Sequence, residues 1–228
     1  VVVAYRTIAG DATADIEIKR SRFRCTLVRV SNEEQARAVI ADCRREYFDG
    51  RHHCSAYVVR EDIPVPDRMP DAAATLIMRS SDDGEPAGTA GAPMLDVLMG
   101  AGVQNVVAVV TRWFGGILLG TGGLVRAYSS VVRAAIEQAG IVRCEPRTEM
   151  AVDLSHADAG RIESALHSAG VPVLGREYGA QVTLTAAVAD EAAFRALLSQ
   201  LTGGHAQVRR VGQRWVSVPD SVGTDAGQ

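Results

Sequence analysis

The sequence predicts an α+β fold in two domains, and three observations lead to that prediction. The chain has 228 residues, which is long for one compact domain and natural for two small ones. After Pro146, strand and helix patterns follow the order βαββαβ, which is typical of a ferredoxin-like fold. The strand and helix patterns of the first part of the chain end before Pro146, and none continues across it. We therefore expect an N-terminal domain at 1–145, a ferredoxin-like domain at 146–220 and a disordered tail at 221–228.

Periodicity locates the elements of the N-terminal domain. Alternating or short apolar runs predict strands at 1–8, 14–19, 22–30, 52–60, 75–79 and 106–110. Helical spacing predicts helices at 31–48, 91–102 and 121–140. The first of these helices should begin at Ser31, because Glu34 completes a capping-box pattern with it. The proline-rich stretch at 61–71 should be a mobile loop.

The C-terminal domain shows the same two periods. Strands are expected at 149–154, 171–178, 181–188 and 206–218. Helices are expected at 156–169 and after Asp190, which is a favourable N-cap residue.

The stretch between Gln104 and Gly140 organises the first domain. Its β-branched run at 106–110 predicts a strand covered on both faces, and Arg112 follows at the carboxyl edge, where open α/β sheets usually bind ligands. A glycine-rich loop then leads into a helix whose first N–H groups lack backbone partners and favour an anion. The expected anion- or RNA-binding residues are Arg112, Gly120, Thr121, Gly122, Gly123 and Arg126.

Two nucleotide-binding loops are excluded by the spacing. A Rossmann loop needs G-x-G-x-x-G directly after the strand, whereas here Val125 replaces the third glycine and Gly120 comes well after Arg112. A P-loop needs a lysine followed by serine or threonine, and none closes this loop. We therefore expect no cofactor. The alternative to an anion site is that the glycines serve only a tight crossover between strand and helix.

An acidic loop at 80–91 carries Asp82, Asp83 and Glu85 among glycines. Three close carboxylates could hold a hard cation such as Mg²⁺, since such ions prefer oxygen ligands. No EF-hand spacing accompanies them, so we expect no metal and a supporting role instead. The carboxylates should pack near Arg112 or Arg126 and fix those arginines through charge-assisted hydrogen bonds.

Other polar residues remain as weaker candidates. Arg20, Arg22 and Arg24 project from one side of a strand, which suits either a binding role or a solvated face. His52 and His53 are adjacent in a strand and point to opposite faces, so they cannot both serve one site. A hydrogen-bonded structural histidine is the expected role of His53.

Composition narrows the function classes. The net charge of −3 and pI of about 6.0 argue against coating nucleic acid through bulk charge. The four cysteines show no paired spacing, which argues against a disulfide scaffold or structural zinc. No membrane-spanning run and no secretory signal pattern are present, so we expect a cytoplasmic protein without a membrane partner.

Three runs of residues resemble a known family. They are TRWFGGILLGTGGLVRAYS, SSDDGEPAGTAG at 80–91 and RSRF at 20–23. Together they resemble the IMPACT family in its bacterial, YigZ-type form over about 18–140, although Trp113 stands where the family pattern has Tyr. The resemblance also keeps His53 among the candidate site residues.

The resemblance implies more than the residues alone. It implies an N-terminal domain similar to the second domain of a small-subunit ribosomal protein, and a C-terminal domain similar to the last domain of elongation factor G. Eukaryotic members regulate translation through a protein contact that restrains a starvation-sensing kinase. We do not expect that partner here, because the additional N-terminal module of those members is missing from this sequence.

Three functions are therefore weighed. The first is a translation-linked regulator that binds RNA, a ribosomal surface or a protein partner through the glycine loop and its arginines. The second is a metal-dependent enzyme that acts on a phosphorylated or peptide substrate. The third is a protein-interaction module. An enzyme is not favoured, because the sequence contains no nucleophile elbow and no cysteine paired with a nearby histidine. The oligomeric state is left open.

Overall fold

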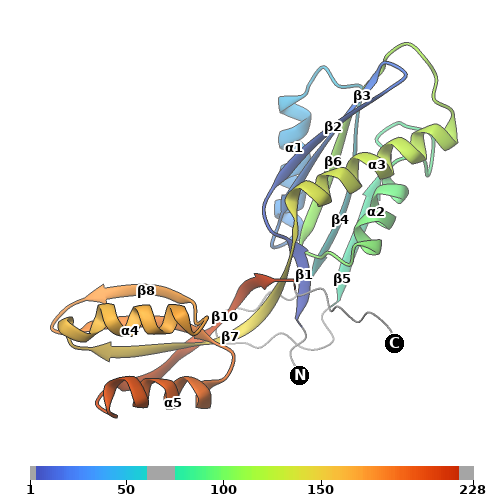
Figure 1. The fold of residues 1–228 in the computed structure, drawn as a ribbon. Coiled ribbons are helices and arrows are strands. Elements are labelled where there is room, and N and C mark those ends of the chain that lie inside the picture. Colours follow the sequence, from blue (N-terminus) through green and yellow to red (C-terminus); the bar gives the residue numbers. More distant parts are fainter. Residues whose placement is uncertain (1–3, 61–74, 221–228) are drawn as a thin grey trace.

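A computed structural model describes residues 4–60 and 75–220 of the chain. Figure 1 shows two α+β bodies joined by a long two-stranded ribbon. The expected loop at 61–71 and tail at 221–228 lie outside the described residues, as do the first three residues of the strand expected at 1–8. No helix within the described ranges is long and apolar enough to cross a membrane.

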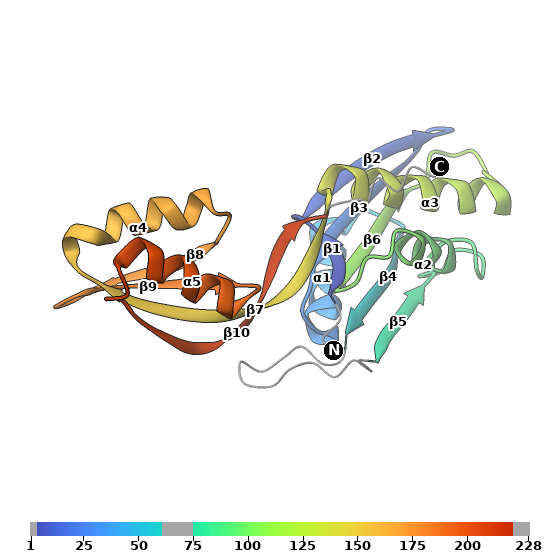
Figure 2. The same cartoon turned by 60° about the horizontal axis from the view of Figure 1, so that its bottom comes forward.

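The first body is built on a five-stranded antiparallel sheet in the order β2-β3-β6-β4-β5. Its strands are β2 (Ala12–Ile18), β3 (Ser21–Arg29), β4 (His52–Arg60), β5 (Leu76–Ser81) and β6 (Val106–Trp113). Its helices are α1 (Glu33–Glu46), α2 (Gly91–Gly100) and α3 (Thr121–Ala139). Helices α2 and α3 cover one face of the sheet and α1 covers the other, as Figure 2 shows from below.

The central strand β6 is buried on both faces, as its β-branched run predicts. Val106, Ala108 and Val110 enter the larger core under α2 and α3. Val107 and Val109 enter a smaller core under α1. The strand is nonetheless flanked only by antiparallel neighbours, so the expectation of a common carboxyl edge typical of parallel sheets is wrong.

Helix α1 begins one residue later than its capping pattern predicts. Asn32, rather than Ser31, is the N-cap, and its side-chain oxygen accepts from the Gln35 backbone N–H at 2.8 Å. The Gln35 side chain in turn accepts from the Ser31 N–H at 2.7 Å. Asn32 and Gln35 therefore take the places expected for Ser31 and Glu34, although the Gln35 side chain accepts from the residue before the N-cap, and Glu34 is left exposed.

The second body follows the expected βαββαβ order. Its strands are β7 (Ile141–Leu154), β8 (Val173–Tyr178), β9 (Val182–Val188) and β10 (Gln207–Pro219), with helices α4 (His156–Ser168) and α5 (Glu191–Thr202). The strands lie in the order β10-β7-β9-β8. Apolar side chains from both helices share one core with β7 and β9.

Strand β7 crosses the boundary expected at 145/146. The first half of β7 pairs with β1 (Tyr5–Ile8), and its second half pairs with β9. On the other side, β10 pairs with β7 along almost the whole length of β7. Pro146 lies between the β1-paired and β9-paired segments, where no neighbour on that side needs an N–H donor, so the proline does not interrupt the strand. Strands β7 and β10 thus form the ribbon that joins the two bodies (Figure 1).

Candidate functional site

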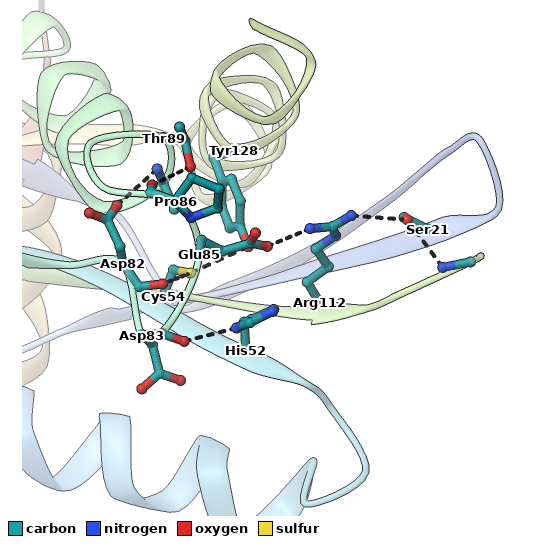
Figure 3. Close-up of polar contacts among 12 residues, drawn as sticks. Ser21, His52, Cys54, Asp82, Asp83, Glu85, Pro86, Thr89, Arg112 and Tyr128 are labelled. Atoms are coloured by element: carbon teal, nitrogen blue, oxygen red, sulfur yellow. Dashed lines mark hydrogen bonds and ion pairs between the residues drawn. The ribbon is translucent and has the colours of Figure 1, made fainter. Parts of the chain in front are cut away.

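A buried polar cluster lies where β6 ends beneath α3, and Figure 3 shows its members. Arg112 faces α3, and its Nη1 donates to the Glu85 carboxylate at 2.6 Å. Only 6% of the Arg112 side chain and 3% of the Glu85 side chain are exposed. The Tyr128 hydroxyl, from α3, donates to the same Glu85 oxygen at 2.8 Å. Two donors thus converge on one carboxylate, which is how a buried charge is tolerated.

Cys54 extends this cluster from β4. Its sulfur lies 3.0 Å from the Asp82 carbonyl oxygen and 3.3 Å from the Tyr128 hydroxyl oxygen, so its S–H donates to one of them. Burial raises the pKa of Cys54 to about 12. Burial, together with the neighbouring Cys54 and Glu85, raises the pKa of Tyr128 still further. Both groups therefore stay protonated at neutral pH, which suits hydrogen-bond donors rather than nucleophiles.

Asp82 of the acidic loop fixes the start of α2. Its two carboxylate oxygens accept from the backbone N–H groups of Gly88, Ala90 and Gly91 at 2.8 to 3.0 Å. Burial acts to raise the pKa of Asp82, but these three hydrogen bonds outweigh it and hold the pKa below its ordinary value. The carboxylate is therefore committed to the helix end.

Asp83 faces the other way and ties the loop to β4 and α1. Its carboxylate contacts the Arg44 guanidinium at 2.6 Å and accepts from the His53 backbone N–H at 2.7 Å. Its carbonyl oxygen lies 2.9 Å from His52 Nδ1, so that ring nitrogen carries the proton (Figure 3). The expected pairing with Arg112 is thus found for Glu85, whereas Asp83 pairs with Arg44, which was not expected, and the Arg126 side chain bonds to the Gly122 carbonyl oxygen instead.

The three carboxylates consequently serve three different partners. Nowhere in residues 4–60 and 75–220 do three His, Cys, Asp or Glu side chains gather closely enough to hold a metal ion. The donor arrangement therefore does not fit the Mg²⁺ alternative weighed for the acidic loop.

A groove of about 420 Å³ opens above the buried cluster, and we call it the α3 groove. It is lined by Arg51, His52, Glu85, Pro86, Arg112, Phe114, Leu118, Leu119, Gly120, Thr121 and Leu124. The first turn of α3 lies in its wall, and no side chain caps that helix, whose N-cap Gly120 has φ of 74°. Arg112 Nε is buried and has no hydrogen-bond partner among the described residues. The groove therefore offers the unpaired backbone donors of the start of α3.

The loop after β6 overhangs the groove and is held at its base. A Cβ at Gly115 would lie 2.0 Å from the carbonyl carbon of Arg20, so only glycine permits this approach to the β2–β3 turn. The Ser21 hydroxyl accepts from the Gly115 N–H at 3.2 Å, and Arg112 Nη2 lies 3.4 Å from the same oxygen. Leu118, beyond this anchor, is 82% exposed, and Phe114, just before it, is 41% exposed.

The structure brings together only part of the expected anion site. Arg112, Gly120 and Thr121 line the α3 groove, and Gly122 and Gly123 occupy the adjoining first turn of α3. Arg126 is exposed and lies outside the lining of the groove. Its Nε donates to the Gly122 carbonyl oxygen at 3.2 Å, which keeps the guanidinium beside that turn.

The weaker candidates lie elsewhere. Arg20 occupies the β2–β3 turn with a positive φ of 65°, and Arg22 pairs with Asp15 and stacks on Trp113. His53 is buried on the α1 face of the sheet, where its Nδ1 lies 3.0 Å from the Thr111 hydroxyl.

Sequence patterns did not reveal several members of the site. Tyr128 belongs to the apolar stripe of α3, and Cys54 and Ser21 belong to strands, so nothing local marks them as polar partners. Arg51 precedes β4 without a recognisable motif, although its position beside His52 at a strand start was visible.

Comparisons with known proteins identify both parts of the chain. The family model described as the Impact N-terminal domain matches residues 19–136. A second model, described as a domain of unknown function (DUF1949), matches residues 152–205.

Individual relatives extend over nearly the whole chain. The chain is 41% identical to the IMPACT family member YigZ of Escherichia coli over 202 residues, which cover 88% of this chain and 94% of that protein. It is 34% identical to the IMPACT family member YvyE of Bacillus subtilis over 90% of each chain. A crystal structure of a hypothetical protein, 38% identical, matches 92% of this chain and 98% of that chain with a TM-score of 0.55. The chain therefore belongs to the IMPACT family.

Proposed function

We propose that this protein is a translation-linked regulator that binds single-stranded RNA in the α3 groove. Membership of the IMPACT family supports the link to translation, because the resemblance implies that role for eukaryotic members. The strand order β10-β7-β9-β8 supports a ferredoxin-like second domain. We also infer that the first domain is related to the second domain of a small-subunit ribosomal protein. Both are likenesses of fold alone, so the assignment of RNA has to rest on the groove itself.

The observation that carries the proposal is the uncapped start of α3 inside a groove that also contains arginines. The first N–H groups of the helix have no side-chain cap, and its dipole favours a negative charge at that end. Arg51 and Arg112 lie in the same lining. A Cβ built at Gly122 meets no atom within 4 Å, so a phosphate can approach the backbone there without obstruction.

Arg112 contributes less charge than its type implies. The Glu85 carboxylate neutralises most of the Arg112 charge, as expected if an acidic-loop carboxylate pairs with this arginine. The positive potential of the groove therefore comes from Arg51, Arg126 and the helix start. Arg51 and Arg126 form no ion pair within residues 4–60 and 75–220, so both guanidinium groups can contact phosphate.

Exposed apolar side chains beside these donors suit the bases. Phe114 lines the groove, and the Arg51 guanidinium lies over its ring at 5.9 Å from the centroid. Aromatic rings and arginine planes are the surfaces on which unpaired bases stack. A groove of about 420 Å³ matches one or two nucleotides rather than a duplex.

The net charge of −3 constrains the binding mode. A protein with a net negative charge does not gain affinity for RNA from its overall charge. Binding should therefore involve contacts to few phosphates, and the affinity should depend only weakly on salt concentration. One or two contacts predict a slope of log K against log salt of about −0.7 to −1.4 for a single strand.

A protein partner is the second candidate, favoured by the same overhanging loop. Ile117 and Leu118 are exposed within four residues of Phe114, and exposed apolar side chains close together are common in protein interfaces. Binding to such a partner would be driven by apolar burial and would show little dependence on salt.

A charge placed at the helix start separates the two candidates. In Gly122→Asp the new carboxylate occupies the first turn of α3, where it is tolerated by the helix and competes with an incoming phosphate. Fluorescence anisotropy with labelled single-stranded RNA should show binding by the native protein and at least about tenfold weaker binding by this variant. Gly160→Asp adds the same charge in α4, where a Cβ also meets no atom, and should bind as the native protein does. Equal binding by all three proteins would refute the groove as an RNA site and leave the protein partner.

A further inference from the structure

A second hollow lies on the opposite face of the sheet, between α1 and the edge strand β5. Its volume is about 370 Å³, and it is separate from the α3 groove, with which it shares no lining residue. Arg37 and Arg44 of α1 are seven residues apart and therefore lie on one stripe of that helix. Arg79 of β5 faces them across the hollow. Three guanidinium groups thus surround one small space.

Hydroxyl groups form the floor of this hollow. In the antiparallel pairing of β4 with β5, Tyr57 lies directly opposite Arg79 and Ser55 directly opposite Ser81. Directly opposed residues of a sheet project from the same face, so all four side chains point toward α1. Ser55 is buried, with 5% of its surface exposed. The floor therefore offers short hydroxyl donors beneath the arginines.

Two of the three arginines are already positioned by carboxylates outside the lining. Arg44 Nη2 contacts Asp83 at 2.6 Å, and Arg37 Nη2 contacts Glu33 at 2.9 Å. Each of these contacts uses one terminal nitrogen of the guanidinium group. Arg79 forms no ion pair within those same residues, so the described charges around the hollow leave one positive charge uncompensated.

We propose that this hollow binds a phosphate monoester group of a small molecule. A monoester carries a charge of about −1.5 to −2 at neutral pH, which the positive surplus around the hollow favours, and its three acceptor oxygens suit the converging N–H and O–H donors. Arginine suits this group because its planar fork donates two parallel hydrogen bonds. The volume of about 370 Å³ accommodates the phosphate together with part of the molecule that carries it. An RNA backbone phosphodiester has fewer free oxygens than a monoester, so it uses fewer of these donors and fits the hollow less well.

Isothermal titration calorimetry on the full chain tests the proposal with four probes: inorganic phosphate, adenosine 5′-monophosphate, adenosine and the dinucleoside phosphate ApA. Phosphate and the monophosphate should bind, adenosine should not, and ApA should bind at least about tenfold more weakly than the monophosphate. Amide shifts in NMR spectra should move at Ser55 and Ser81 when phosphate is added. Absence of phosphate and monophosphate binding would overturn the proposal. Equal binding of ApA would also overturn it and would indicate recognition of an RNA backbone instead.

Variants locate the binding within the molecule. Arg79→Ala should weaken binding of the monophosphate by about tenfold or more, since a charge-assisted contact is lost. Arg37→Ala is a second variant, at a side chain that is 70% exposed, so the test does not depend on the folding of one protein. The matched control is Arg45→Ala, which removes the same charge from α1 at a residue outside the hollow. A loss in the control as large as in Arg79→Ala would show that only general charge is involved and would overturn the site.

Discussion

Glu85 and Arg112 form an ion pair from which water is almost wholly excluded, in the wall of the α3 groove. The two residues are 27 positions apart and come from the acidic loop and the central strand, respectively. Their contact links two of the three runs that resemble the IMPACT family. The pair therefore has a structural role, because it fixes one side of the groove in which we propose that RNA binds.

Removing one member of this pair should be costly. Glu85→Gln leaves the Arg112 charge buried without compensation, and breaking a buried pair in this way destabilises a protein by about 3–5 kcal/mol. Urea denaturation measures the change in the free energy of unfolding. Asp42→Asn, which breaks the exposed pair between Asp42 and Arg45, is the control and should cost less than about 1 kcal/mol. Similar losses in the two variants would contradict the buried pair.

Asp83 should contribute little to stability. The Arg44 side chain that it contacts is half-exposed, and an asparagine oxygen can still accept from the His53 N–H. Asp83→Asn should therefore lower the free energy of unfolding by about 1 kcal/mol or less. The same variant tests the metal alternative when both proteins are titrated with Mg²⁺. If the native protein binds Mg²⁺ stoichiometrically and Asp83→Asn does not, with stability unchanged, the hypothesis of a metal site at the acidic loop would be supported instead.

How far the sequence predicts this structure depends on the distance over which each signal acts. The strand at β6, the helix at α3 and the βαββαβ order all follow from local periodicity. The antiparallel pairing of β6 with β3 and β4 joins segments about 50–90 residues apart, so no local pattern reveals it.

The same limit applies to the candidate site. Glycine and arginine positions near the start of α3 were visible, because helix starts have a recognisable chemistry. The partner of Arg112 was expected only as one of three loop carboxylates. Tyr128 lies at a helical spacing typical of an ordinary core residue, so its sequence position does not indicate that its hydroxyl donates to Glu85. Placing a domain boundary at Pro146 missed the continuation of β7, because a proline can lie in a strand between the segments that pair with two different neighbours.

His53 should make stability dependent on pH. Burial lowers the pKa of His53 below its ordinary value of 6.5. As the pH falls through about 6.5, the unfolded chain therefore takes up a proton that the folded protein does not, and stability falls. His53→Gln should flatten the dependence of urea midpoint on pH between about 7.5 and 5.5. An unchanged profile in the variant would contradict the assignment of His53 as a buried neutral residue.

The first sheet should fold without the second body. A chain of residues 1–147 retains all five strands from β2 to β6 and helices α1 to α3. It loses β10, which pairs with β7, and Asp220, which contacts Arg6 at 2.8 Å. We expect a cooperative thermal transition at a lower temperature than that of the full chain. An unfolded or aggregated product would contradict independent folding of the N-terminal domain.

The most direct test of RNA binding in the α3 groove is the salt dependence of affinity in two arginine variants. Arg51 lines the groove, whereas Arg133 lies on α3 two turns beyond Arg126 and outside the groove. Anisotropy titrations with single-stranded RNA at a series of salt concentrations should show that Arg51→Ala weakens binding and reduces the slope of log K against log salt by about 0.7, which corresponds to one lost phosphate contact. Arg133→Ala should retain the native affinity and slope. Native affinity and slope in Arg51→Ala, or equal losses in both variants, would contradict the proposed function.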